Sequence, residues 1–281
     1  MARRAGPSAR SRRLAHALRR LRIDGGFSSI EVAKAVGMSG SKICRLEAAE
    51  LGIYQDDLEK LLDFYRVPKK RRVELLDIAR NAEQRSWLRT RNPHFPGDWQ
   101  TWSDFEDEAS TLLHYDPLTI PGLLQTREYA REIIRATGPD LADEQVDALV
   151  ASRMARQSLL GKVEPVRLAV VLEEGVLTRP FGEDGAAGRQ IRALIDAAEQ
   201  STITIQILSP QVGLHLGLTG PFIVLEYDDE PSLVWLENSL TSLFLEDDDQ
   251  VDAYVAAWGE LAKLARTPEE SLAFMSKMAD R

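Results

Sequence analysis

The chain has 281 residues, of which 44% are hydrophobic and 28% charged, a composition that excludes a disordered or fibrous protein. The length suits roughly two domains, no apolar run is long enough to cross a bilayer, and a single cysteine predicts a reducing cytoplasm. By itself, the formal net charge of −9 argues against a nucleic-acid partner.

That charge is divided unevenly along the chain. Residues 1–91 hold 21 Lys+Arg and 11 Asp+Glu, a net charge of +10, so the rest of the chain carries −19. Such an asymmetry favours binding of nucleic acid or another anionic surface by the basic half. Eight arginines and no acidic residue occur in the first 22 residues. We expect residues 1–11 to form a disordered basic arm that phosphates attract.

An all-α domain of about five helices is predicted over residues 12–84. Leu14, Leu18 and Leu21 fall on one face of the first helix, which the glycines that follow Asp24 would end. Similar apolar spacing, and a proline in a first helical turn, predict two later helices over residues 58–65 and 68–83.

The second and third helices carry the most specific local signals. Ser28 and Glu31 form an S-x-x-E capping box, Gly37 ends this helix after about two turns, and Ser39 can cap the next. Two helices joined by a tight glycine-containing turn form a helix-turn-helix, whose second helix can lie in the major groove of DNA. The alternative is a helical bundle with no role in DNA binding.

The run from Phe27 through Val36-Gly37-Met38-Ser39 to Glu47 resembles the Xre-type, phage-repressor-like family, and the resemblance extends over about Leu14 to Val67. By position, the resemblance implies that a DNA-facing set consists of Ser29, Ser39, Gly40, Ser41 and Cys44. It implies phosphate contacts for Lys42 and Arg45, and an intrachain ion pair between Arg22 and Glu47. Because Ser29 stands where the family commonly carries Gln, which can read adenine, base reading is expected to be modest.

Cys44 has two interpretations. Facing outward between Lys42 and Arg45, its thiol could act as a redox sensor. We favour the plainer interpretation, in which a small side chain lies at the contact surface.

The acidic half is predicted to be an α+β domain over residues 103–281, joined to the basic half by a connector of poor periodicity over 85–102. A helix is expected over 103–115. Helices are expected to precede, interrupt and follow the strands, and this order predicts a mixed sheet with flanking helices. The expected strands cover residues 166–172, 202–208, 222–227, 233–236 and 240–245.

Several motifs of this half together resemble the C-terminal domain of unknown function in actinobacterial antitoxin-like Xre regulators. They include Pro121-Gly122-Leu123-Leu124-Gln125-Thr126, Arg153 with Arg156-Gln157, and Val212-Gly213-Leu214-His215. The resemblance implies transcriptional regulation, often beside a small partner protein encoded nearby. It does not say what the domain binds.

Catalytic machinery is not evident in the sequence. It contains no P-loop and no G-x-S-x-G motif, and the adjacent Glu173 and Glu174 would face opposite ways on a strand. We therefore expect no enzymatic activity, no cofactor and no metal. Arg153, Arg156 and His215 form the candidate ligand or partner site. The plainer interpretation gives the arginines ion pairs within an acidic domain and packs the histidine in the fold.

The sequence thus predicts a cytoplasmic, sequence-specific transcriptional regulator that binds double-stranded DNA as a homodimer and has no membrane association. Its C-terminal domain would sense a ligand or a small protein partner. One alternative is an antitoxin-like protein–protein adaptor whose DNA binding is mainly autoregulatory. Another is an enzyme fused to a DNA-binding domain.

Overall fold

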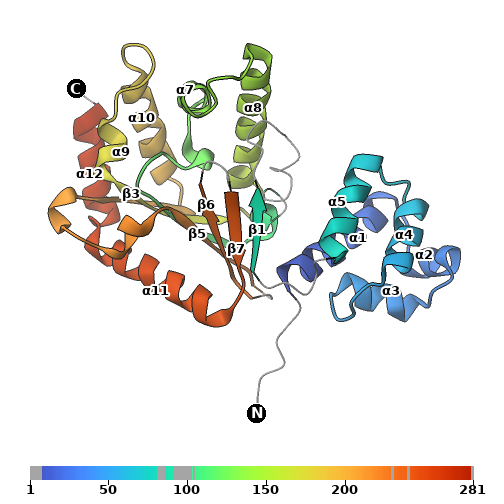
Figure 1. Cartoon of the computed structure of the whole chain (residues 1–281). Helices are drawn as coiled ribbons and strands as arrows, with labels where there is room; N and C mark the ends of the chain where they lie inside the picture. The colour runs from blue at the N-terminus through green and yellow to red at the C-terminus, as the bar shows by residue number, and fades with distance from the viewer. Residues whose placement is uncertain are drawn as a thin grey trace. The chain divides into compact units, whose positions relative to one another are not determined.

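The computed structural model describes residues 8–80, 86–90, 103, 105–228, 231–238 and 241–279. The chain divides into two compact units, Met1–Trp87 and Leu88–Arg281 (Figure 1). Among the described residues, no helix has the length and apolarity needed to cross a membrane.

The N-terminal unit is built only from helices around a core of its own. Apolar side chains from five helices meet there, including Leu18, Val32, Ile43, Leu58 and Leu75. This confirms the all-α fold predicted from the apolar spacing. The helices are α1 (Ala9–Asp24), α2 (Ser29–Val36), α3 (Gly40–Glu47), α4 (Gln55–Phe64) and α5 (Lys69–Arg80).

The structure moves one predicted boundary and adds a strand to the predicted connector. Ser8 caps α1, since its side chain accepts a hydrogen bond from the backbone of Ser11, so residues 9–11 begin a helix and do not belong to an arm. Residues 1–7 lie outside the described residues. The expected connector over 85–102 contains strand β1 (Ser86–Thr90), and its other residues lie outside the described part of the chain.

The C-terminal unit contains a seven-stranded mixed sheet of order β1-β7-β6-β5-β2-β3-β4. β2, β3 and β4 run parallel to one another, whereas β5 pairs antiparallel with β2, and β5, β6 and β7 pair antiparallel in turn. This confirms the predicted mixed sheet with flanking helices. The strands after β1 are β2 (Thr111–Asp116), β3 (Arg167–Glu173), β4 (Ile203–Leu208), β5 (Phe222–Glu226), β6 (Leu233–Glu237) and β7 (Thr241–Leu245).

Strand β2 replaces the second half of the helix that we predicted over 103–115. Residues 105–108 are helical, but the chain extends from Thr111 onward. β2 is a central strand, in which Leu113 lies opposite Ala169 of β3 on one side and Val224 of β5 on the other. Pairing on both sides satisfies the backbone polar groups of this segment, so tertiary pairing outweighs the helix-like spacing of its apolar residues.

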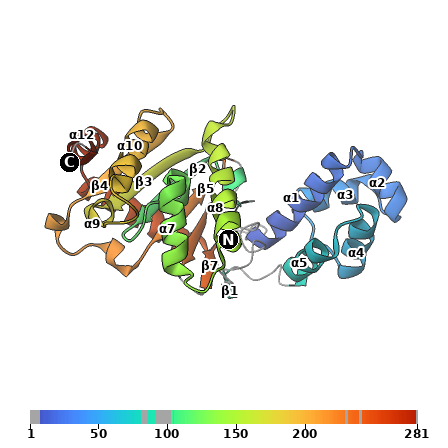
Figure 2. The same cartoon turned by 90° about the horizontal axis from the view of Figure 1, so that it is seen from above.

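Helices cover both faces of this sheet. α11 lies against one face, where Leu261 packs with Tyr115, Val171 and Val224. α7, α8 and α10 lie on the opposite face (Figures 1 and 2). Successive strand residues point to opposite faces, so Leu112 and His114 of β2 face α7 and α8. The helices are α7 (Arg127–Thr137), α8 (Asp143–Arg156), α9 (Glu174–Thr178), α10 (Ala186–Ala198), α11 (Asp248–Leu264) and α12 (Pro268–Ala279).

The outer edge of β4 is covered by the turn between α11 and α12. The backbone N–H of Arg266 donates to the carbonyl of Ile207 at 3.0 Å, and the N–H of Ile207 donates to Ser271 Oγ at 2.9 Å. An uncovered edge strand offers unpaired backbone groups to other chains, and this arrangement removes that exposure.

Candidate DNA-binding surface and a cavity in the C-terminal unit

The turn between α2 and α3 has the geometry of a helix-turn-helix. The Ser28–Glu31 capping box is complete, and Gly37 ends α2 in a left-handed conformation with φ of 72°. Such a conformation strains any residue with a Cβ, which explains the glycine. The Ser39 side chain then accepts a hydrogen bond from the backbone of Lys42 and so caps α3. The turn therefore fixes the direction in which α3 leaves α2.

A buried ion pair holds the far end of α3. Arg22 Nε lies 2.8 Å from Glu47 Oε1, and Arg22 Nη2 lies 2.8 Å from Glu47 Oε2, a bidentate arrangement. Arg22 Nη1 also donates to the carbonyl of Phe27 at 3.0 Å. Glu47 raises the pKa of Arg22. The ion pair expected between these residues thus ties α1, the start of α2 and α3 together.

The residues expected to face DNA lie on the outer side of α2 and α3. Ile43 and Leu46 are buried beneath α3, whereas Ser39, Ser41, Cys44 and Arg45 are exposed. Gly40 and Ser29 are half-buried where α2 and α3 approach each other. Arg45 lies 3.6 Å from Glu50, and both side chains are more than half exposed, so this contact contributes little.

Lys42 forms an ion pair that the sequence did not indicate. Its Nζ lies 2.5 Å from Asp57 Oδ2, which joins α3 to the first turn of α4. The Asp57 carboxylate neutralises the Lys42 ammonium group and holds this side chain against α4. This ion pair gives Lys42 a role in positioning α3, and its expected phosphate contact stays a prediction.

Ile30 is a surface residue that the sequence reasoning missed. Its side chain is 74% exposed, and a Cβ built on Gly40 would lie 3.8 Å from the Ile30 Cγ1. An apolar side chain beside the start of α3 can contact a thymine methyl group in the major groove. The signal was present, because Ile30 stands off the inward face that Val32 and Ala33 define on α2.

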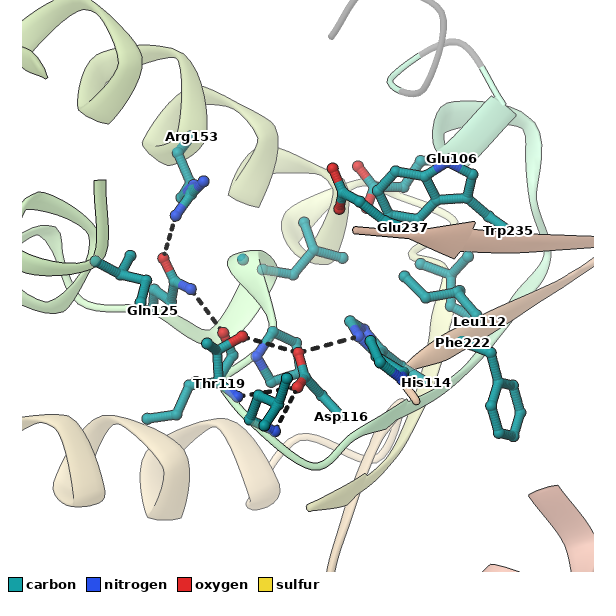
Figure 3. A pocket seen from close by; sticks show the side chains of 18 of the residues that line it. Glu106, Leu112, His114, Asp116, Thr119, Gln125, Arg153, Phe222, Trp235 and Glu237 are labelled. Carbon is teal, nitrogen blue, oxygen red and sulfur yellow. Dashed lines mark hydrogen bonds and ion pairs between the residues drawn. The ribbon is translucent and has the colours of Figure 1, made fainter. Parts of the chain in front are cut away.

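A cavity of about 340 Å³ lies in the C-terminal unit, between the sheet and the segments that precede and form α7 and α8 (Figure 3). Its lining includes Leu112, His114 and Asp116 of β2, Ile223 of β5 and Trp235 of β6. This volume falls at the lower end of the range of small-molecule pockets, about 300–1,000 Å³.

His114 and Asp116 form the polar part of the cavity floor. Asp116 Oδ1 accepts hydrogen bonds from the backbone of Leu118 and Thr119, and Oδ2 accepts one from the Thr119 hydroxyl, each at 2.9 Å. His114 Nε2 lies 3.9 Å from Asp116 Oδ2, beyond hydrogen-bond reach. Burial, and then the charge of Arg156, lower the pKa of His114 to about 3. The imidazole is therefore neutral at pH 7.

The two arginines of the predicted ligand site line this cavity, but they already have partners. Arg156 makes two hydrogen bonds of 2.9 Å to Glu106, whose side chain is almost fully buried. Arg153 Nη1 donates to Gln125 Oε1 at 2.9 Å (Figure 3). The structure thus gives Arg156 the ion pair of the plainer interpretation, whereas Arg153 forms a hydrogen bond to a neutral amide.

His215 does not join the arginines, contrary to the site that we predicted. Its Nε2 lies 3.2 Å from Glu173 Oε1, which also accepts a hydrogen bond of 2.9 Å from the Tyr115 hydroxyl. Tyr115 belongs to the core on the α11 side of the sheet, whereas His114 faces the cavity. The alternation of β2 therefore separates His215 from the cavity by the thickness of the sheet.

Comparisons with known proteins agree with this division into two units. Residues 13–75 match the model of a helix-turn-helix domain, and residues 99–277 match that of a domain of unknown function, DUF5753. A search of curated proteins finds no match. Among solved structures, TrmBL2, an archaeal chromatin protein described as showing a novel mode of DNA binding, is 16% identical. That alignment covers 76% of this chain and 67% of that chain at a TM-score of 0.33, too distant to establish a shared fold.

Proposed function

The chain belongs to the DUF5753 family, and we propose that it is a sequence-specific transcriptional regulator that binds duplex DNA through α3. The observation that carries the proposal is the arrangement of α3. Its N-terminus is capped by Ser39, its inner face is buried through Ile43 and Leu46, and its outer face is exposed within a helix-turn-helix. The net charge of +10 over residues 1–91 supports an anionic partner.

The outer face of α3 suggests how sequence would be read. Ser41 can exchange a hydrogen bond with a base edge, and Ile30 can contact a thymine methyl group. Arg45 and the backbone amides at the start of α3 suit phosphate oxygens, which set position without specifying sequence. Gly40 contributes no side chain, so backbone contacts supply much of the affinity.

The finer identity that we propose is an Xre-type regulator that acts as a homodimer. The motifs of α2 and α3 support the first part. Two-fold operators, which make dimers usual for this motif, support the second. Sedimentation of the protein with a selected duplex would show two chains per site, whereas one chain per site would contradict the dimer.

Selection from random duplexes, followed by binding of the full chain to the selected sequence, tests the proposal. Ser41→Ala should reduce the preference for the selected duplex over a scrambled one, because it removes a base contact. Arg45→Ala should weaken binding to both duplexes alike, because it removes a phosphate contact. Arg192→Ala is the matched control, since it removes one exposed positive charge from α10. Equal effects of Arg45→Ala and Arg192→Ala would contradict a DNA-binding role for α3.

For the C-terminal unit we propose a regulatory role without catalysis. The cavity supports the sensing of a small molecule, and the acid–base residues Glu173 and His215 lie across the sheet from it. An antitoxin-like adaptor is the second candidate. It is favoured by three leucines between β4 and β5 whose exposed fractions are 93%, 60% and 60%: Leu214, Leu216 and Leu218. Capture of a stoichiometric small protein by the full chain, lost on Leu214→Ser, would support the adaptor.

A further inference from the structure

The cavity floor is one row of side chains that runs across three neighbouring strands. Ile223 lies directly opposite Trp235 on β6 and His114 on β2, so all three side chains face the same way. Neighbouring strands lie about 4.8 Å apart, and the row is therefore roughly 10 Å long. An indole at one end, an imidazole at the other and an aliphatic side chain between them form a floor about as long as two fused rings.

The wall above this floor is held in place before any ligand enters. Gln125 Nε2 donates to the carbonyl of Ile120 at 2.6 Å, and Arg153 fixes the other end of the same amide. Gln157 Nε2 donates to the carbonyls of Gly122 and Gln125 at 3.2 and 2.7 Å. A wall fixed by side-chain amides keeps its shape, which lowers the entropic cost of binding.

The charges around the cavity disfavour a charged ligand. Arg156 is matched by Glu106, and the Asp116 carboxylate already accepts three hydrogen bonds. An anion would face the carboxylates of Asp116 and Glu237, and a cation would face Arg153 and Arg156. A ligand ion would lose its hydration at a site where Arg156 is already matched by Glu106 and Asp116 already accepts three hydrogen bonds.

His114 supplies the polar group that a neutral ligand can use. Within the part of the chain that the structure describes, no hydrogen bond from the protein reaches its imidazole, although the side chain is only 14% exposed. Its ring nitrogens open onto the cavity, so a bound molecule can form hydrogen bonds with them. A neutral imidazole can donate through one ring nitrogen and accept through the other.

We propose that this cavity binds an uncharged, flat, two-ring heteroaromatic molecule that lies against Trp235 and exchanges a hydrogen bond with His114. A second part of the proposal, that this molecule is an effector of DNA binding, rests on the function proposed above. The binding site itself does not depend on that function.

Three indoles of similar size test the charge and shape of the site on the full chain. The probes are indole-3-carboxamide, which is neutral, indole-3-carboxylate, an anion, and indol-3-ylmethylamine, a cation. We expect saturation-transfer NMR to show the amide binding at least about tenfold more tightly than either ion. Failure of the amide to bind, or tighter binding of an ion, would overturn the proposal.

Two substitutions locate the binding. His114→Leu keeps the side-chain volume but removes the hydrogen bond, so it should weaken the amide complex about tenfold. His215→Leu makes the same change across the sheet and should leave the affinity unchanged. Equal affinities of the wild type and His114→Leu would overturn the site. Should His114→Leu fail to fold, ¹⁵N-histidine spectra of the wild type decide instead: the amide should shift the assigned His114 imidazole resonances, and unchanged His114 resonances would overturn the site.

DNA affinity in the presence of saturating amide tests the effector role separately. A change of about threefold or more that disappears in His114→Leu would support it, whereas an unchanged DNA affinity would overturn the effector role. Loss of probe binding with intact DNA binding contradicts only the cavity. Probe binding by a chain that does not bind DNA contradicts only the proposed function.

Discussion

The two units of this chain use charged residues in opposite ways. In the N-terminal unit, exposed basic residues remain on the surface, as Arg45 does, while the buried Arg22–Glu47 pair supports the recognition helix. In the C-terminal unit, Arg156 at the cavity is paired with Glu106 inside the fold. Exposed charge attracts a polyanion even where it has a weak surface partner, as Arg45 has in Glu50, whereas charge paired inside the fold favours neutral ligands. Net charge is therefore informative only for each unit separately.

The largest expected effect separates the stabilities of the two units. Arg22→Ala leaves Glu47 buried without its partner, and its side chain is only 8% exposed. We expect the N-terminal unit to lose about 3 kcal/mol of unfolding free energy, while the C-terminal unit is unaffected. Hydrogen exchange followed by mass spectrometry measures the stability of each unit separately. Loss of protection in peptides of both units would contradict their independence.

A second effect concerns the acid stability of the C-terminal unit. The pKa of His114 is about 3 in the folded chain and about 6.5 when unfolded, so the unfolded state alone binds a proton as the pH falls through this window. His114 should thus remove about 2 kcal/mol of stability between pH 7 and pH 5. Urea unfolding at both pH values checks this. The His114→Leu variant should not show this loss of unfolding free energy. An equal loss in the wild type and the variant would show that His114 is not the cause.

The smallest effects compare two glycines of the helix-turn-helix. Gly37→Ala should destabilise the N-terminal unit by about 1 kcal/mol, because its φ of 72° strains a residue with a Cβ. Gly40→Ala should stabilise it by about 0.5–1 kcal/mol, since Gly40 is helical and the added methyl has room beside Ile30. Thermal unfolding of both variants measures the difference. A change of the same sign in both would contradict the assigned conformations.

Local signals made the N-terminal unit predictable. Ser28, Gly37 and Ser39 each act within a few residues of their own position, and all three stand where the sequence placed them. The fold class of the C-terminal unit was also predictable, because β-branched strands alternate with helices. Contacts between distant segments were not. Lys42 pairs with Asp57, and nothing in the spacing of α3 indicates a carboxylate on the next helix.

The cavity was even less predictable from the sequence, because segments distant in the chain form it. The spacing of Phe105 from Leu112 and Leu113 favoured a helix through the segment of β2, so His114 and Asp116 were not assigned to one face of a sheet. Only pairing with β3 and β5 sets their direction. The sequence did place Arg153 and Arg156 near each other, but it could not show that Gln125 and Glu106 occupy them. It also could not show that His215 lies on the other face.

The salt dependence of duplex binding by the full chain tests the central claim most directly. If α3 and its basic surroundings contact phosphates, the logarithm of the binding constant should fall linearly with the logarithm of the salt concentration. The slope should be about −0.9 for each phosphate neutralised. Arg45→Ala should make the slope shallower by about one such contact, and Arg192→Ala should leave it unchanged. Binding that does not respond to salt, or no binding to any duplex, would contradict the account.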